Sequence, residues 1–213
     1  MRTDVLIDRL IGELKPIRRR TALRDAIVLV VLGAVELGLF LALGLMRPDM
    51  PMAMHLPSFW WKLASLGLIA LVSGTVAIVS LDPVRSPRRG LRWTVALIVV
   101  CLAIGWILDA SRDGYSVLLA RLDWPNGVQC LSTMVVLSMP AFVGLGLLMR
   151  RGAPTDDGGT ALAAGLAAAA WGAFVFVFAC PFDDPFYVAV WFSLGCGTVT
   201  LFARFTLPRL TRW

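Results

Sequence analysis

Six long apolar stretches recur along this chain and constrain its fold more than any other feature. They lie at residues 26–46, 61–81, 93–108, 129–149, 160–180 and 186–205. The hydrocarbon core of a bilayer is about 30 Å thick, and a helix of about 20 apolar residues crosses it. A backbone in lipid must satisfy its own hydrogen bonds, so each stretch is expected to be a helix. We predict an all-α integral membrane protein, a six-transmembrane-helix bundle preceded by a short cytoplasmic amphipathic helix.

The composition argues against an enzyme. Only 16% of the residues are charged, against about 25% in soluble domains. The chain has one histidine, His55, and lacks the G-x-S-x-G, H-E-x-x-H and glycine-rich phosphate-loop motifs. Its cysteines stand far apart, without the C-x-x-C pair that a quinone-linked thiol oxidoreductase needs. We therefore expect a protein that catalyses no reaction and requires no cofactor.

Basic residues are distributed unequally between the two sides of the predicted bundle. Six spans put both termini on one side, and that side holds 16 of the 20 Lys and Arg residues. The other side holds Arg47, Lys62, Arg112 and Arg121 together with Asp49, Asp109, Asp113, Asp123, Asp183 and Asp184. By the positive-inside rule we predict a multi-pass protein of the bacterial inner membrane with both termini cytoplasmic. Topology thus explains the net charge of +6, so the expected partner is the lipid bilayer and direct nucleic-acid binding is not expected.

Small residues at every fourth position indicate how the helices pack. Such stripes let helix backbones approach each other closely in lipid. One lies in the fifth span and one in the first: Ala161, Gly165, Ala169 and Ala173, and Ala34, Gly38 and Ala42. We expect both stripes to pack inside the bundle, with a dimer interface as the alternative.

Glu36 is a carboxylate near the middle of the first span. A charged side chain at that depth costs about 2.5–3.5 kcal/mol on insertion scales, so we expect Glu36 to be protonated, paired or turned toward a polar interior. One interpretation is a neutral acid that hydrogen-bonds to a neighbouring helix. The other is a proton or cation site, which would make the protein a small transporter or channel.

The cysteines fall into two groups by depth. Cys101 and Cys196 lie near mid-membrane, where a thiol packs as a small apolar group. Cys130 opens the fourth span and Cys180 closes the fifth, and because these spans run in opposite directions both thiols reach the same boundary. Contact between them stays open, because a disulfide requires Cα atoms within about 7 Å. On the periplasmic side such a pair is accessible to oxidants and soft metal ions.

The residues before the first span have helical periodicity. Ile7, Leu10, Ile11 and Leu14 follow the i, i+3, i+4, i+7 spacing of one apolar face. Thr3 or Asp4 caps its start and Pro16 ends it. So short a helix is unstable alone in water, so its apolar face needs a partner protein, the lipid interface or the protein's own cytoplasmic surface. We divide the chain into a cytoplasmic segment, 1–24, and a membrane domain, 25–213.

Several of these residues together resemble the NrsF-type family of bacterial membrane anti-sigma factors, the negative regulators of sigma F. The resemblance rests on six spans, the cysteine that opens the fourth, and these positions: Thr3, Asp4, Ile7, Leu10, Leu14, Pro16, Cys180, Pro181, Pro185, Phe186, Trp191, Pro208, Arg209 and Leu210. It implies a protein that holds an extracytoplasmic-function sigma factor at the inner membrane and releases it under stress. It also implies that Cys130 and Cys180 are needed for the response.

Our leading hypothesis is such a membrane-bound anti-sigma factor. Its sigma-binding residues are expected to be Thr3, Asp4, Ile7, Leu10, Ile11, Leu14 and Pro16. Its sensing residues are expected to be Cys130 and Cys180, which respond to an oxidant or bind a heavy metal through sulfur. The competing hypothesis is a small inner-membrane transporter or channel with Glu36 as its coupling site.

Overall fold

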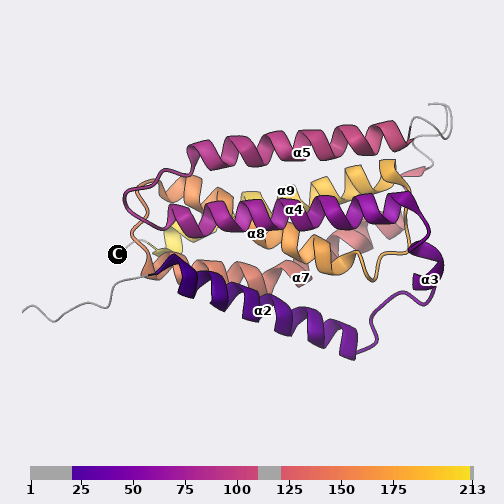
Figure 1. Ribbon diagram of the computed structural model, residues 1–213, viewed down its shortest axis with the longest axis horizontal. Helices are drawn as coiled ribbons and strands as arrows, with labels where there is room; N and C mark the ends of the chain where they lie inside the picture. Colours follow the sequence, from indigo (N-terminus) through magenta and orange to yellow (C-terminus); the bar gives the residue numbers. More distant parts are fainter. Residues whose placement is uncertain (1–20, 110–120, 212–213) are drawn as a thin grey trace, which may run out of the picture.

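The computed structural model describes residues 21–109 and 121–211, and most of them are helical (Figure 1). The long helices are α2 (Ala22–Ala42), α4 (Pro57–Ser80), α5 (Arg88–Asp109), α7 (Trp124–Arg151), α8 (Asp157–Phe176) and α9 (Pro185–Thr211). A short helix, α3 (Met50–Ala53), lies between α2 and α4. The predicted N-terminal helix and its sigma-binding residues lie outside the described residues.

The long helices form a bundle around α8. Within the described ranges, six helices are long and apolar enough to cross a membrane, which confirms the predicted fold class. α8 packs against α4, α7 and α9, while α2 and α5 lie on opposite sides of the bundle (Figure 1). α2 contacts mainly α7, and α5 contacts α4 and α9.

Small side chains explain why α8 occupies the centre. The stripe of Ala161, Gly165, Ala169 and Ala173 is buried along its whole length. A Cβ atom added at Gly172 would lie 2.6 Å from the backbone N of Ser138 in α7, so the two backbones are in close contact. The expectation that this stripe packs inside the bundle is confirmed.

The corresponding expectation for the first span is wrong. Ala34, Gly38 and Ala42 are exposed, and no atom lies within 4 Å of a Cβ atom added at Gly38. α2 is rotated so that Gly33 lies against the Trp171 ring of α8 instead. The small-residue stripe of α2 therefore faces away from the bundle.

Several helix ends differ from their predicted positions. α2 ends at Ala42 rather than near residue 46, because Gly44 has φ +68°, a left-handed conformation that ends helices. α7 begins at Trp124, so Cys130 lies in the second turn of the helix rather than at its start. α8 ends at Phe176, which leaves Cys180 in the connection to α9.

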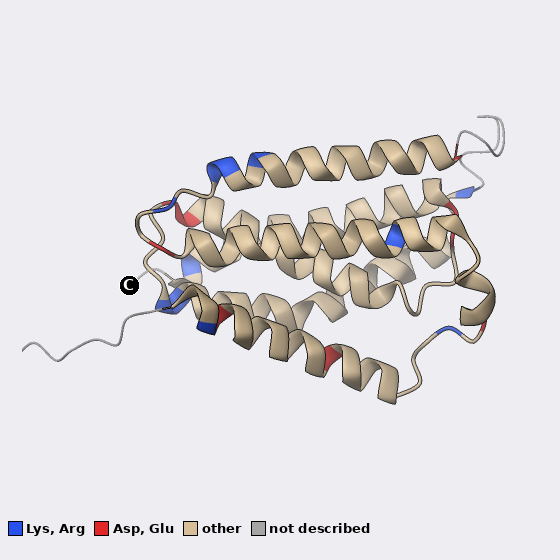
Figure 2. Cartoon of the chain, viewed as in Figure 1, with Lys and Arg blue, Asp and Glu red and all other residues tan. Residues whose placement is uncertain are grey.

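Charged residues gather at the two ends of the bundle (Figure 2). We call one end the basic end, because α5 begins and α7 and α9 finish there with clustered arginines: Arg88, Arg89, Arg92, Arg150, Arg151 and Arg209. We call the opposite end the hairpin end, because there residues 177–184 connect α8 to α9.

We expect Gly172→Val to lower the free energy of unfolding by about 1–3 kcal/mol, because the added side chain forces α7 and α8 apart. Gly38→Val is the matched control, since it adds the same side chain to an exposed face of α2. Thermal unfolding of both variants in detergent measures the difference. Equal melting temperatures would contradict the close contact of α7 with α8.

Candidate functional site

Residues 177–184, which we call the Cys180 hairpin, carry the most polar contacts at the hairpin end. Pro181 lies within this connection and Pro185 begins α9, and neither has an N–H group to continue a helix from the preceding turn. Asp184 precedes α9, and its Oδ1 atom accepts a hydrogen bond from the Phe186 N–H at 3.2 Å. This contact satisfies an N–H group that the helix itself leaves free.

Cys130 and Cys180 lie side by side in this region. They belong to one buried cluster, with 5% and 0% of each residue exposed, and the two thiols are close enough for their charges to interact. Both are free thiols. The Tyr187 hydroxyl in α9 donates to Cys130 Sγ at 3.3 Å. The sequence predicted a shared boundary for the two cysteines and left their contact open, and the structure brings them together.

The Cys180 thiol is held in its protonated form. Its interaction with the neighbouring Cys130 thiol, followed by burial, raises the pKa of Cys180 well above the usual range of a thiol. Its Sγ atom also lies 3.7 Å from the Phe182 carbonyl oxygen, to which it donates.

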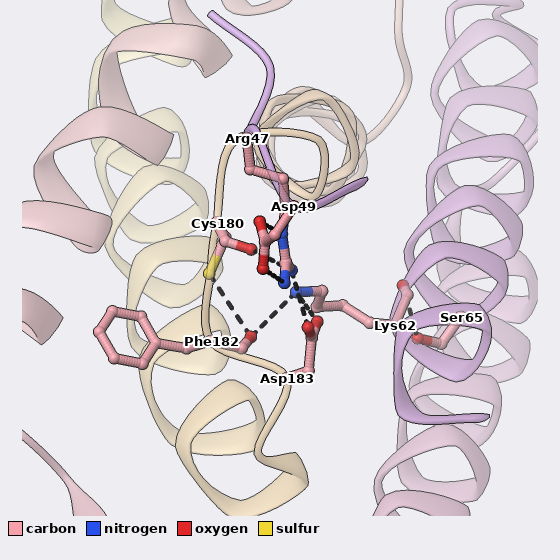
Figure 3. A network of polar contacts seen from close by, with 7 residues as sticks. All are labelled: Arg47, Asp49, Lys62, Ser65, Cys180, Phe182 and Asp183. Atoms are coloured by element: carbon pink, nitrogen blue, oxygen red, sulfur yellow. Dashed lines mark hydrogen bonds and ion pairs between the residues drawn. The ribbon is translucent and has the colours of Figure 1, made fainter. Parts of the chain in front are cut away.

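A buried ion network holds the hairpin in place (Figure 3). Lys62 in α4 has no exposed side-chain surface, and its Nζ atom donates to Asp183 Oδ1 at 2.9 Å and to the Phe182 carbonyl at 3.0 Å. Arg47 Nη1 donates to Asp183 Oδ2 at 2.7 Å and to the Cys180 carbonyl at 2.9 Å. One carboxylate therefore binds two cations from different parts of the chain.

Asp49 completes the coordination of Arg47. Its two carboxylate oxygens accept from Arg47 Nε and Nη2, each at 2.7 Å. These hydrogen bonds raise the pKa of Arg47 and lower the pKa of Asp49. Arg47 therefore stays charged although its side chain is only 4% exposed.

A third cation binds the other aspartate of the hairpin. Arg121, just before α7, donates to Asp184 and also to Asp109 at the end of α5. The guanidinium group lies over the Phe186 ring, 5.6 Å from its centroid. Asp183 and Asp184 thus connect the hairpin directly to the segment after α2, to α4 and to Arg121, and through Arg121 to the end of α5.

Sequence reasoning missed this network. It assigned these three cations, and Asp183 and Asp184 with them, to the less basic side only as part of a charge count. One sequence feature could have predicted it. These cations lie on the less basic side, in or beside apolar spans, where an unpaired charge is costly and a counter-ion is therefore expected.

Glu36 forms a hydrogen bond to a neighbouring helix, which agrees with the first of the two interpretations of this residue. Its Oε2 atom accepts a hydrogen bond from Trp171 Nε1 of α8 at 3.0 Å. Glu36 is on the same helix as Gly33, against which the Trp171 ring packs. The contact joins α2 to the central helix.

The described residues contain no group of three or more His, Cys, Asp and Glu side chains arranged to hold a metal ion. The thiol pair offers two sulfur atoms, which are ligands that soft metal ions prefer. Cys130 and Cys180 are neighbours in one buried cluster, so oxidation can join them in a disulfide.

Comparison with known proteins identifies relatives of the whole chain. The family model described as NrsF, negative regulator of sigma F, matches residues 10–213. The anti-sigma-F factor NrsF of Caulobacter vibrioides (strain NA1000 / CB15N) is 32% identical over 219 residues, covering 100% of each chain. No solved structure matches. Both descriptions name a regulator of a sigma factor and not an enzyme.

We expect Lys62→Met to lower the free energy of unfolding by about 3 kcal/mol, because it leaves the buried Asp183 carboxylate without one of its two cations. Arg88→Met breaks an exposed pair with Asp156 and should cost at most about 1 kcal/mol. Unfolding in mixed detergent and dodecyl sulfate micelles measures both. An equal loss in the two variants would show that the buried network does not stabilise the bundle.

Proposed function

We propose, because this chain belongs to the NrsF family of negative regulators of sigma F, that it holds an extracytoplasmic-function sigma factor at the bacterial inner membrane. Residues 1–24 bind the sigma factor, and the membrane domain from residue 25 onward senses the signal. A sigma factor held in this way cannot reach RNA polymerase. Direct contact with DNA is therefore unnecessary.

In this proposal the basic end faces the cytoplasm and the Cys180 hairpin faces the periplasm. The excess of arginines at the basic end supports this orientation through the positive-inside rule. Both termini then lie in the cytoplasm, where the sigma factor is. The thiol pair lies at the oxidising side of the membrane, where disulfides form and persist.

The sigma factor binds the apolar face formed by Ile7, Leu10, Ile11 and Leu14, with Thr3 or Asp4 capping the helix and Pro16 ending it. An amphipathic helix commonly binds by placing its apolar face in a groove of a partner. Such a contact excludes water, so a charge introduced there remains unpaired.

We expect Leu10→Asp or Leu14→Asp to abolish sigma-factor binding, with a loss of at least about 2 kcal/mol of binding free energy. Gly12→Asp is the control, because it introduces the same charge on the opposite side of the predicted helix. Co-purification of the sigma factor with detergent-solubilised membranes measures retention. If both leucine variants retained the sigma factor as well as Gly12→Asp, residues 1–24 would not bind it through this face.

The proposal that Cys130 and Cys180 sense the signal rests on one observation. Two free thiols lie together at a hairpin that buried ion pairs hold in place. Oxidation by hydrogen peroxide forms one S–S bond and reduces the peroxide to two water molecules, which take up the protons of both thiols. A soft heavy metal ion instead displaces these protons and binds both sulfurs. Either reaction changes the contact between α7 and the Cys180 hairpin and so favours the released state.

We expect Cys130→Ser and Cys180→Ser each to abolish release of the sigma factor by peroxide or by a soft metal ion. Cys101→Ser is the matched control, because this thiol lies in α5 in a separate cluster and should leave the response unchanged. A reporter gene under sigma-factor control, measured across inducer concentrations, gives the result. An unchanged dose response in both of the first two variants would exclude the pair as the sensor.

The transporter hypothesis has weaker support. Glu36 has a hydrogen-bond partner in Trp171, which fits a packing role between α2 and α8. The family to which the chain belongs is described by regulation of a sigma factor. We therefore retain the anti-sigma factor as the proposed function.

A further inference from the structure

Arg47, in the segment after α2, forms hydrogen bonds to the Cys180 hairpin through both its backbone and its side chain. Its N–H group donates to the Phe178 carbonyl at 2.9 Å. Its Nη1 atom donates to Asp183 Oδ2 at 2.7 Å and to the Cys180 carbonyl at 2.9 Å. Arg47 follows the end of α2 by five residues, so these contacts restrain the position of that end.

Cys180 carries both the thiol of the pair and an acceptor of Arg47. Its thiol belongs to the same buried cluster as Cys130 of α7, whereas its carbonyl oxygen accepts a hydrogen bond from the Arg47 guanidinium group. An S–S bond is about 2.05 Å long, much shorter than a hydrogen-bonding contact between two sulfurs. Closing this bond draws Cys180 toward α7 and disturbs the geometry that its carbonyl offers to Arg47.

α2 otherwise lies at the edge of the bundle (Figure 1). Large apolar side chains along most of its length are exposed: Leu23, Ile27, Val28, Val30, Val31, Val35, Leu39 and Leu41. Its contacts within the bundle are mainly with α7, then with α4 and with the Trp171 ring of α8. At the basic end, the chain that precedes α2 is the proposed sigma-binding segment. A shift at the Arg47 end of a rigid helix therefore reaches the segment at the other end.

We propose that Arg47 is a positioning residue that couples the thiol pair to α2, and through α2 to the N-terminal segment. This inference rests on the proposed function and adds the route by which the signal crosses the bundle. With reduced thiols, Arg47 binds the hairpin and fixes the end of α2. After oxidation, the contact with the Cys180 carbonyl is weakened and α2 moves relative to α8.

Hydrogen–deuterium exchange of the purified full-length protein tests the coupling without a sigma factor. Diamide oxidises the pair, because its N=N bond takes up the two electrons and two protons that the thiols lose. In the wild type, we expect backbone amides of residues 43–56 to exchange about ten times faster after oxidation. In Arg47→Gln the same amides should exchange fast in both states. Unchanged exchange in the wild type, with the disulfide verified by mass spectrometry, overturns the inference.

Sigma-factor retention then separates this inference from the proposed function. In Arg47→Gln we expect equal retention with reduced and with oxidised thiols, whereas Arg88→Gln at the basic end should respond like the wild type. If Arg47→Gln responded like the wild type, the coupling would be wrong. Oxidation could instead speed up amide exchange of residues 43–56 in the wild type without changing retention of the sigma factor. The coupling of the thiol pair to the end of α2 would then stand, and the proposed sensing function would fail.

Arg47→Lys is a second variant for the same measurement, to be used if Arg47→Gln does not fold. Lysine retains the charge but lacks the planar group that binds Asp49 at two points while reaching Asp183 and Cys180. We expect amide exchange of residues 43–56 in this variant to respond to oxidation less than in the wild type. A full wild-type response in Arg47→Lys would overturn the specific role of the guanidinium group.

Discussion

The carboxylate of Asp183, shared between Arg47 and Lys62, is the interaction on which the geometry of the hairpin end depends. Removing two cations from water is costly, and in a protein interior only a well-placed counter-ion with further hydrogen bonds compensates that cost. Here the carbonyl groups of Cys180 and Phe182 supply those additional bonds. The hairpin, α4 and the segment after α2 consequently form one unit, because displacing any of them leaves a buried charge unpaired.

The ion network also controls the access of solvent and reagents to the two cysteines. Cys130 and Cys180 are in contact with each other but almost absent from the surface. A reagent reaches them only when the hairpin opens locally, and the free energy of that opening is set by the ion pairs that hold it. The reactivity of the two thiols therefore depends on the strength of these ion pairs as well as on the chemistry of the sulfur atoms.

The spans were predictable because lipid imposes their length and their helical form, and all six were found. What the sequence could not provide is the lateral arrangement of the helices. The rotation of α2 placed Ala34 and Gly38 outside the bundle, although the same spacing in α8 is buried. Likewise, opposite helix directions put Cys130 and Cys180 at one boundary, but only the packing of α7 against α8 and α9 brings them into contact. The partners of Lys62 and Arg47 are far away in sequence, and no local pattern marks them.

The long sequence separation within the ion network has a consequence for biogenesis. Asp183 follows Lys62 by 121 residues and Arg47 by 136 residues, so a ribosome delivers both cations well before their shared counter-ion. Synthesis proceeds from the N-terminus, and a lone charge within a span disfavours its partition into lipid. Arg47 has a nearby counter-ion in Asp49, whereas Lys62 of α4 meets its counter-ion only when the connection between the last two helices has been made.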